Sequence, residues 1–375
     1  MIHVTHATDS APTALLREPG AFAWWYVDVV DDEGNGAVLI WSWGLPFLPG
    51  YTDAARRQTA QRAEQRPSLN VAFYRQGRPA FYLLREIEPG DAAWSGPVAA
   101  GEVERWTFGQ SVIERVVEGD SVTLGATLDL DMTGGVRLTG RFDLTGARSR
   151  IEPAPTPHAS PHLWGPVAPH AAGRATIEVD GDALAVEGLA YHDRNWSPRP
   201  LDQLGIERWT WARVPMGDES LLLYLLEPHG AAPPTAIVRR LHADGRVLGG
   251  HDAQVSVESH RRDLFGVSMP SRLTVRDGDD ELTLAVTSVV DRGPFYLRAL
   301  VEARRDRRLL GAGWAECVVP DRIDLPRHRP LVRMAVDAGP GRSSFWLPLF
   351  SGLRQTRLRR LLRMKPRVSR IEATA

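Results

Sequence analysis

The sequence has little cysteine, no long apolar run and almost no net charge. Cys317 is the single cysteine among 375 residues, so no disulfide can form within the chain and no cysteine-based metal site is expected. No apolar stretch approaches the ~18 residues that a membrane-spanning helix needs, because residues 37–48 and 221–226 are short or interrupted. A formal net charge of −1 gives no global field that would attract nucleic acid.

Several common catalytic motifs are also missing. The chain contains no glycine-rich phosphate-binding loop, no Gly-x-Gly-x-x-Gly after a strand and no Gly-x-Ser-x-Gly nucleophile turn. His158 and His162 have the spacing of a zinc-binding helix, but a proline precedes each of them and excludes that helix. The first residues lack the basic and apolar regions of a signal peptide. We therefore expect a cytoplasmic protein and assign no metal site.

Most of the chain has the pattern of short strands separated by turn residues. Aromatic and β-branched residues fill these segments, and Gly, Asp and Asn clusters lie between them, as in a β-sandwich or β-barrel. The predicted strands are residues 22–30, 37–43, 68–75, 78–86, 112–118, 121–130, 135–143, 175–179, 184–189, 208–214 and 220–226.

Helices are few, and the chain shows a weak internal repeat. A short helix is predicted over residues 53–66, with Thr52 or Asp53 as its N-cap and Pro67 at its end. An aromatic strand, an acidic turn and an apolar strand occur near the start and again after residue 205. We therefore expect an all-β protein of two domains, residues 1–199 and 200–375, joined at a proline-rich stretch near residue 200.

Tryptophan is frequent, with 12 in the chain, and the residues gather in a few short segments. An aromatic lining of this kind suits a large, flat, apolar ligand, although a β core uses tryptophan equally well. The candidate substrate-binding residues are Trp25, Trp43, Trp196, Trp209 and Trp211.

Two short segments combine aromatic and ionisable residues. Side chains two positions apart share one face of a strand, so His162 lies beside Trp164, and Tyr191 lies beside Asp193. Aromatic surroundings raise the pKa of a carboxyl because burial disfavours its charged form. A neutral carboxylic acid can donate a proton, and ring faces stabilise a nearby cation. Such a site could protonate a carbon–carbon double bond. In the alternative interpretation, Asp193 is a turn residue paired with Arg194, and His162 is a structural histidine.

These segments resemble the carotenoid 1,2-hydratase (hydroxyneurosporene synthase) family. Its wider relatives include lipocalin-like proteins of the AttH type, kievitone hydratase and cofactor-free Diels–Alderases. The resemblance covers most of the chain and rests on the order and spacing of several short motifs. Those motifs are residues 22–28, 70–74, 162–169, 191–195, 200–201, 208–211, 294–298 and 311–316.

The resemblance implies two packed lipocalin-like β domains and a hydratase that needs no metal or organic cofactor. Asp193 would be the catalytic acid, and His162, Trp164 and Tyr191 would complete the catalytic site. The acid would protonate a terminal double bond of an acyclic isoprenoid or carotenoid, and water would add to the resulting cation. Alternatives in the same fold are an isoprenoid or polyketide cyclase, including a Diels–Alderase, and a non-catalytic carrier of an apolar ligand.

The chain departs from the hydratases beside the acid. They carry Tyr-Leu-Asp-Ser-Asn, where this chain has Tyr191-His192-Asp193-Arg194-Asn195. A nearby arginine would lower the pKa of the aspartate and work against acid catalysis. Strand alternation, however, directs His192 and Arg194 to the opposite face.

The C-terminal segment predicts a basic amphipathic helix over residues 353–364. Leu358, Leu361 and Leu362 share a helical face, and arginines surround them. Such a helix suits the anionic inner face of a membrane, or else it packs on the barrel. Peripheral membrane contact would suit an enzyme whose substrate is an apolar polyene or terpenoid.

Overall fold

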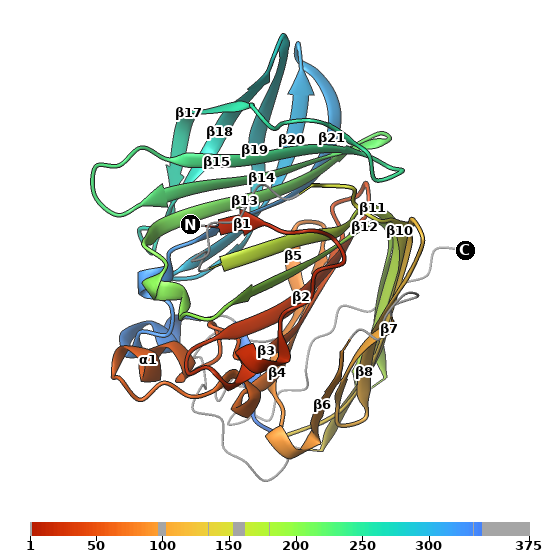
Figure 1. The fold of residues 1–375 in the computed structure, drawn as a ribbon, viewed down its shortest axis with the longest axis vertical. Coiled ribbons are helices and arrows are strands. Elements are labelled where there is room, and N and C mark those ends of the chain that lie inside the picture. Colours follow the sequence, from red (N-terminus) through yellow and green to blue (C-terminus); the bar gives the residue numbers. More distant parts are fainter. Residues whose placement is uncertain are drawn as a thin grey trace.

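Antiparallel strands joined by tight turns dominate the computed structural model, which describes residues 2–96, 103–133, 135–152, 162–179, 181–332 and 334–339. Many strands alternate buried and exposed side chains. In β9 (Ser121–Met132) every second side chain is buried, because successive residues of a strand point to opposite faces of the sheet. The prediction of an all-β, lipocalin-like fold with few short helices is confirmed: two curled half-barrel sheets pack against each other (Figure 1).

The first sheet is formed mainly by the N-terminal half of the chain. Its strand order is β22-β5-β4-β3-β2-β12-β11-β10-β9-β8-β7-β6, with β1 paired to β11. The last strand, β22, returns from the C-terminal part of the chain and pairs in parallel with β5. The strands are β1 (Ile2–Val4), β2 (Phe22–Val30), β3 (Gly36–Trp43), β4 (Pro67–Arg75), β5 (Arg78–Glu86), β6 (Ala92–Ser95), β7 (Val103–Phe108), β8 (Ser111–Glu118), β9, β10 (Val136–Ala147), β11 (His162–Val179), β12 (Asp182–Ser197) and β22 (Ala335–Asp337).

The second sheet follows β12 along the chain and lies above the first sheet in Figure 1. Its strand order is β16-β15-β14-β13-β21-β20-β19-β18-β17. The strands are β13 (Ile206–Met216), β14 (Glu219–Pro228), β15 (Thr235–His242), β16 (Val247–Gly249), β17 (Gln254–Arg262), β18 (Ser268–Asp277), β19 (Asp280–Arg292), β20 (Tyr296–Arg305) and β21 (Arg308–Val318). Short 3-10 helices cover Thr13–Arg17, Ala63–Gln65, Pro89–Asp91, Leu201–Gln203, Pro320–Arg322 and Pro326–Leu331.

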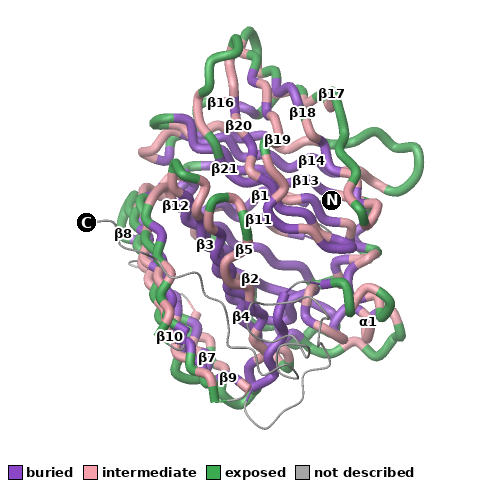
Figure 2. The backbone as a smooth tube through the Cα atoms, turned by 180° about the vertical axis from the view of Figure 1, so that it is seen from behind, coloured by how far each residue is buried: buried purple, intermediate pink, exposed green. Residues whose placement is uncertain are grey.

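The hydrophobic core has three parts, one inside each curled sheet and one between the two sheets. Strand β2 is buried on both faces and therefore serves two of these parts. Trp25 and Val27 enter the interior of the first sheet, whereas Trp24 and Tyr26 enter the layer between the sheets. Figure 2 shows the same arrangement, with buried central strands and partly exposed outer strands.

The pairing of β2 with β12 brings the two ends of the N-terminal half together. In this antiparallel register Asp193 lies opposite Tyr26, and Tyr191 lies opposite Asp28. On its other side β12 pairs with β11, where Trp164 lies opposite Asn195. Both strands are much longer than the sequence predicted, so all of the predicted catalytic residues lie within regular sheet.

The predicted helix over residues 53–66 is wrong in its extent. Helix α1 (Tyr51–Arg56) follows Gly50, which has a left-handed φ of 84°. It stops after six residues because Gln58 turns to a φ of 61° and the N–H of Thr59 donates back to the carbonyl of Ala54 at 2.9 Å. This is a left-handed C-terminal cap, here made without glycine. The sequence offers no glycine to mark this end of the helix.

One predicted segment, the basic helix over residues 353–364, lies outside the described residues. Membrane contact through that helix stays a prediction. Within the described ranges, no helix has the length and apolar character needed to cross a bilayer.

A buried ion pair joins the two sheets beside the predicted site. Arg213 of β13 donates to Asp28 of β2 at 2.6 Å and to the carbonyl of Ala190 of β12 at 2.8 Å. Both charged side chains are 0% exposed. A buried guanidinium left without such partners costs several kcal/mol, so this contact fixes how β13 sits on the first sheet.

We predict that Asp28→Ala lowers the free energy of unfolding by about 3–5 kcal/mol, because it leaves the Arg213 guanidinium buried and unpaired. The matched control is Asp244→Ala, which breaks a surface pair with Arg246 whose side chains are 44% and 56% exposed. That loss should be clearly smaller, because water screens an exposed ion pair. Equal losses in chemical denaturation of the two variants would contradict the proposed role of the ion pair.

Candidate active site between the two sheets

Asp193 is held by three hydrogen bonds in the layer between the sheets. Its Oδ2 accepts from Trp164 Nε1 at 2.8 Å and from Tyr191 OH at 2.8 Å. Its Oδ1 accepts from Asn195 Nδ2 at 2.9 Å. The residue is 3% exposed. Strand alternation brings Tyr191, Asp193 and Asn195 to one face of β12, and the neighbouring strand β11 supplies Trp164.

His162 reaches Asp193 through Asn195 rather than directly. The amide of Asn195 donates to Asp193, so its Oδ1 is the acceptor for His162 Nε2 at 3.0 Å. Burial lowers the pKa of His162 to about 4, so the imidazole is neutral at pH 7 and carries its proton on Nε2. His162 therefore orients the amide that donates to the Asp193 carboxyl.

Aromatic rings from both sheets surround the carboxyl. The ring centroids of Trp164 and Tyr224 lie 4.8 Å apart in an edge-to-face arrangement. Tyr191 contacts Trp211 at 5.6 Å, and Tyr26 contacts Trp211 at 5.5 Å. Because Tyr224 and Trp211 come from β14 and β13, the enclosure depends on packing of the second sheet on the first.

Burial is the dominant influence on the acidity of Asp193. Desolvation raises its pKa from 3.8 to about 7, and the hydrogen bonds from Trp164 and Tyr191 oppose this rise. The nearby carboxyls of Asp28 and Glu316 raise the pKa further. At neutral pH a large fraction of Asp193 is therefore the uncharged acid, which is the form that can donate a proton.

The ionisable neighbours in sequence point away from Asp193, as strand alternation predicts. Arg194 donates to Ser10 Oγ at 2.8 Å and to the carbonyl of Ala7 at 2.7 Å. Its guanidinium lies 3.8 Å from the carboxylate of Glu104, inside the first sheet. His192 contacts the ring of Trp25 at a centroid distance of 5.6 Å on the same face. The expected arginine–aspartate conflict does not arise, because the sheet separates the two side chains.

The five predicted substrate-binding tryptophans divide between two places. Trp209 and Trp211 lie in the layer between the sheets, together with Trp164 and Tyr191. The other three lie inside the first sheet, across the sheet from Asp193, and they are Trp25, Trp43 and Trp196. The rings of Trp25 and Trp43 pack with that of Trp106, at centroid distances of 4.7 Å and 6.3 Å.

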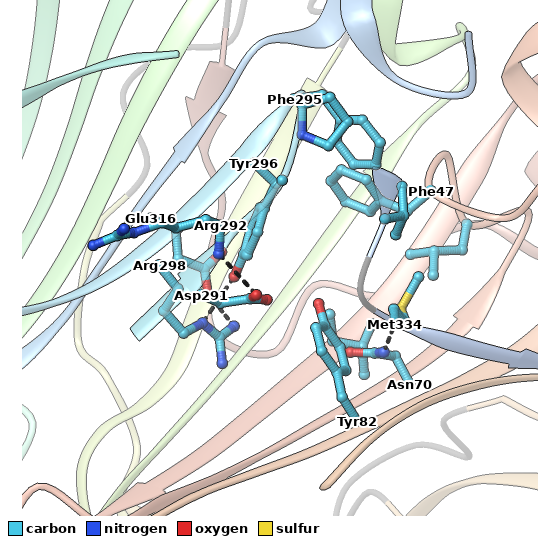
Figure 3. A pocket seen from close by; sticks show the side chains of 15 residues that line it. Phe47, Asn70, Tyr82, Asp291, Arg292, Phe295, Tyr296, Arg298, Glu316 and Met334 are labelled. Carbon is cyan, nitrogen blue, oxygen red and sulfur yellow. Dashed lines mark hydrogen bonds and ion pairs between the residues drawn. The ribbon is translucent and has the colours of Figure 1, made fainter. Parts of the chain in front are cut away.

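A cavity of about 70 Å³ lies in the same layer as the Asp193 cluster. Figure 3 shows its lining, with Phe47, Phe295 and Met334 on one side and a charged group on the other. In that group Arg298 pairs with Glu316. The volume corresponds to roughly five waters, so it accommodates the end of an apolar chain.

Tyr26 connects this cavity to the Asp193 cluster. Its hydroxyl donates to Glu316 Oε1 at 3.3 Å, and Glu316 lines the cavity. Its ring lies 6.1 Å from that of Tyr191, the hydrogen-bond donor to Asp193. Asp193 itself does not line the cavity, so Tyr26 is the contact between the cavity wall and the cluster around the carboxyl.

Three contributors to the site were not predicted as site residues. Asn195 follows the alternation that groups Tyr191 with Asp193, so extending that pattern by two positions would have found it. Tyr26 and Tyr224 carry no comparable signal, because strand pairing and sheet packing bring them to the acid. Within the described part of the chain, no group of three or more His, Cys, Asp and Glu side chains is arranged to hold a metal ion.

The two curled sheets and the buried acid between them define a lipocalin-like β protein with an aromatic interface site. The sequence profile of a family described as carotenoid hydratase CrtC matches residues 44–342. The chain therefore belongs to the carotenoid hydratase CrtC family, and the resemblance seen in the sequence motifs is confirmed.

Individual relatives agree with this assignment. A hydroxyneurosporene dehydrogenase of Chlorobaculum tepidum is 25% identical over 313 residues, which cover 78% of this chain and 80% of the relative. An acyclic carotenoid 1,2-hydratase of Rubrivivax gelatinosus is 29% identical over 311 residues, which cover 82% and 71%. A crystal structure described as an AttH candidate from Nitrosomonas europaea aligns with a TM-score of 0.54 at 16% identity, covering 80% of this chain and 92% of that one. This last likeness supports the fold alone.

We predict that Asn195→Ala lowers the free energy of unfolding by about 2 kcal/mol or more. The change leaves the buried His162 Nε2–H without an acceptor and Asp193 Oδ1 without its donor, and each loss is costly. Asn35→Ala is the control, because Asn35 bonds Asp31 in a partly solvated turn. Urea denaturation should show a clearly smaller loss for the control, and a loss as large as that of Asn195→Ala would refute the network.

Proposed function

We propose that the protein is a hydratase that adds water to a terminal double bond of an acyclic carotenoid or related isoprenoid. Membership of the carotenoid hydratase family and the names of the relatives support the reaction and the apolar substrate. The observation that carries the mechanism is a buried carboxyl whose pKa is raised to about 7 among aromatic side chains from both sheets.

In this proposal Asp193 is the general acid. Its Oδ2 already accepts two hydrogen bonds, whereas Oδ1 accepts one, from Asn195. Each carboxyl oxygen has two lone-pair positions, so Oδ1 is the oxygen on which the acidic proton resides. Transfer of this proton to the terminal carbon of the alkene leaves a tertiary carbocation and the Asp193 carboxylate.

The surroundings of Asp193 suit that cation. The faces of Trp164 and Tyr191 present negative electrostatic potential, which stabilises a positive charge in a desolvated site. Water then adds to the cation, and the proton that it releases restores the acid. The protein supplies proton transfer, positioning and a dry environment, and the proposed reaction requires no organic cofactor or metal.

The cavity between the sheets is the proposed binding place for the end of the substrate chain. Its apolar wall includes Phe47, Phe295 and Met334, which suit a hydrocarbon terminus. Asp193 does not line the cavity, so the substrate must open a path to it, and Tyr26 contacts both the cavity residue Glu316 and Tyr191 beside the acid. We therefore assign Tyr26 a positioning role at the entrance to the acid.

The prediction is that Asp193→Asn reduces hydration of an acyclic carotenoid by about 10²-fold or more, the usual contribution of a general acid. Binding of the polyene, followed by quenching of tryptophan fluorescence, should change little because the variant keeps the shape of the site. Hydration should be followed in isotopically labelled water, since a hydratase places that oxygen in its product.

Asp129→Asn is the control, because Asp129 pairs with Arg137 at the surface of the first sheet and should leave hydration unchanged. Product formation by Asp193→Asn at the wild-type rate would refute the role of the acid. A ring-closed product without labelled oxygen would identify a cyclase instead, and binding without any product would identify a carrier.

A further inference from the structure

The second sheet contains a cavity of its own, away from Asp193. It has a volume of about 230 Å³ and lies between the end of β17 and the β17–β18 loop, the start of β18, the second half of β19 and the start of β20. The floor is apolar, formed by Met269, Val286, Val289 and Leu297. These residues belong to the core of the second sheet or pack against it, so the cavity opens from solvent into the interior of that half-barrel.

The rim of this cavity is basic. Arg261, Arg262 and Arg292 line it, together with a single acid, Asp263. Within the described ranges, none of these three guanidinium groups takes part in an ion pair. Asp263 Oδ1 instead accepts the backbone N–H groups of Phe265 and Val267 at 3.0 and 2.8 Å, which holds the loop in shape.

An exposed leucine completes the rim. Leu264 lines the cavity and is 92% exposed. The other exposed large apolar residues of the described chain reach no more than 49%, so Leu264 is exceptional. Its position extends the apolar floor outward, between arginines that attract negative charge. A single-chain amphiphile has the matching chemistry, with one anionic end and one apolar end.

We propose that this cavity binds a long-chain carboxylate, with its head group on the rim arginines and its hydrocarbon chain on the apolar floor. Arg261 and Arg262 are exposed, so water screens their attraction and each contributes modestly. The buried chain supplies most of the affinity. The carboxylate site shares no lining residue with the Asp193 cluster and does not depend on the hydratase proposal, although Arg292 also lines the 70 Å³ cavity between the sheets.

The test is calorimetric titration of the full chain with dodecanoate below its micelle concentration. One dodecanoate should bind saturably, and octanoate should bind more weakly, because each buried methylene is worth up to about fourfold in affinity. The double variant Arg261→Gln/Arg262→Gln should weaken dodecanoate binding about tenfold and leave binding of neutral dodecanol unchanged. The matched control, Arg307→Gln/Arg308→Gln, removes the same charge at the β20–β21 turn and should bind dodecanoate like the wild type.

Three results would overturn this proposal. Equal dodecanoate affinity of the rim variant and the wild type would show that the arginines do not hold the head group. Equal binding of dodecanol and dodecanoate would show that charge is not recognised. Retention of the protein on anionic vesicles without binding of monomeric dodecanoate would assign this rim to membrane docking instead.

Discussion

Asp193 is held by donors that carry no charge, in a layer that both sheets protect from water. An indole, a phenol and a carboxamide donate to its two oxygens. Asp28 lies in the same layer, on the neighbouring strand, yet its direct partner is the guanidinium of Arg213. Burial raises the pKa of both carboxyls, to about 7 for Asp193 and to about 6 for Asp28, where Arg213 counteracts the rise.

Two carboxyls in one apolar layer thus acquire different tasks from their partners. The guanidinium favours the charged form of Asp28, which then joins the two sheets as part of a buried ion pair. The neutral donors leave Asp193 close to its neutral form at physiological pH, where it can act as an acid.

The first sheet keeps opposite charges apart over very short distances along the chain. Arg194 follows Asp193 directly, but its guanidinium enters the other face and lies near Glu104. This separation is possible because β12 is buried on both faces from Ala190 to Ser197. Because each face of the sheet has its own core, one residue can hold a buried arginine on one face while its neighbour keeps a raised carboxyl pKa on the other.

Much of this arrangement could be predicted from the sequence. The hairpin of β2 and β3 follows from apolar runs around an acidic glycine turn, and alternation correctly groups Tyr191 with Asp193 and directs Arg194 away. The same rule places Trp196, three positions after Asp193, on the opposite face, so the pattern already argued against its direct contact with the acid.

Other parts depended on long-range contacts that no local pattern contains. Pairing of β11 with β12 brings Trp164 to Asp193, and packing of the second sheet adds Tyr224 and Arg213. The end of helix α1 is set by a left-handed Gln58, for which the sequence gives no signal. Strand alternation alone does not connect residues 162–164 with residues 191–195. The motif resemblance does, because it assigns both segments to one site.

The most direct test of the central claim is the pKa of Asp193 itself. Carbon-13 NMR of aspartate carboxyls across a pH titration, with Asp193→Asn as the reference for assignment, measures this value in the folded protein. The account predicts a carboxyl resonance that is absent from the variant and titrates with a midpoint near 7, neutral below that pH and charged above it. A midpoint near the ordinary aspartate value of about 4 would show a charged carboxylate at neutral pH and would contradict the proposed acid.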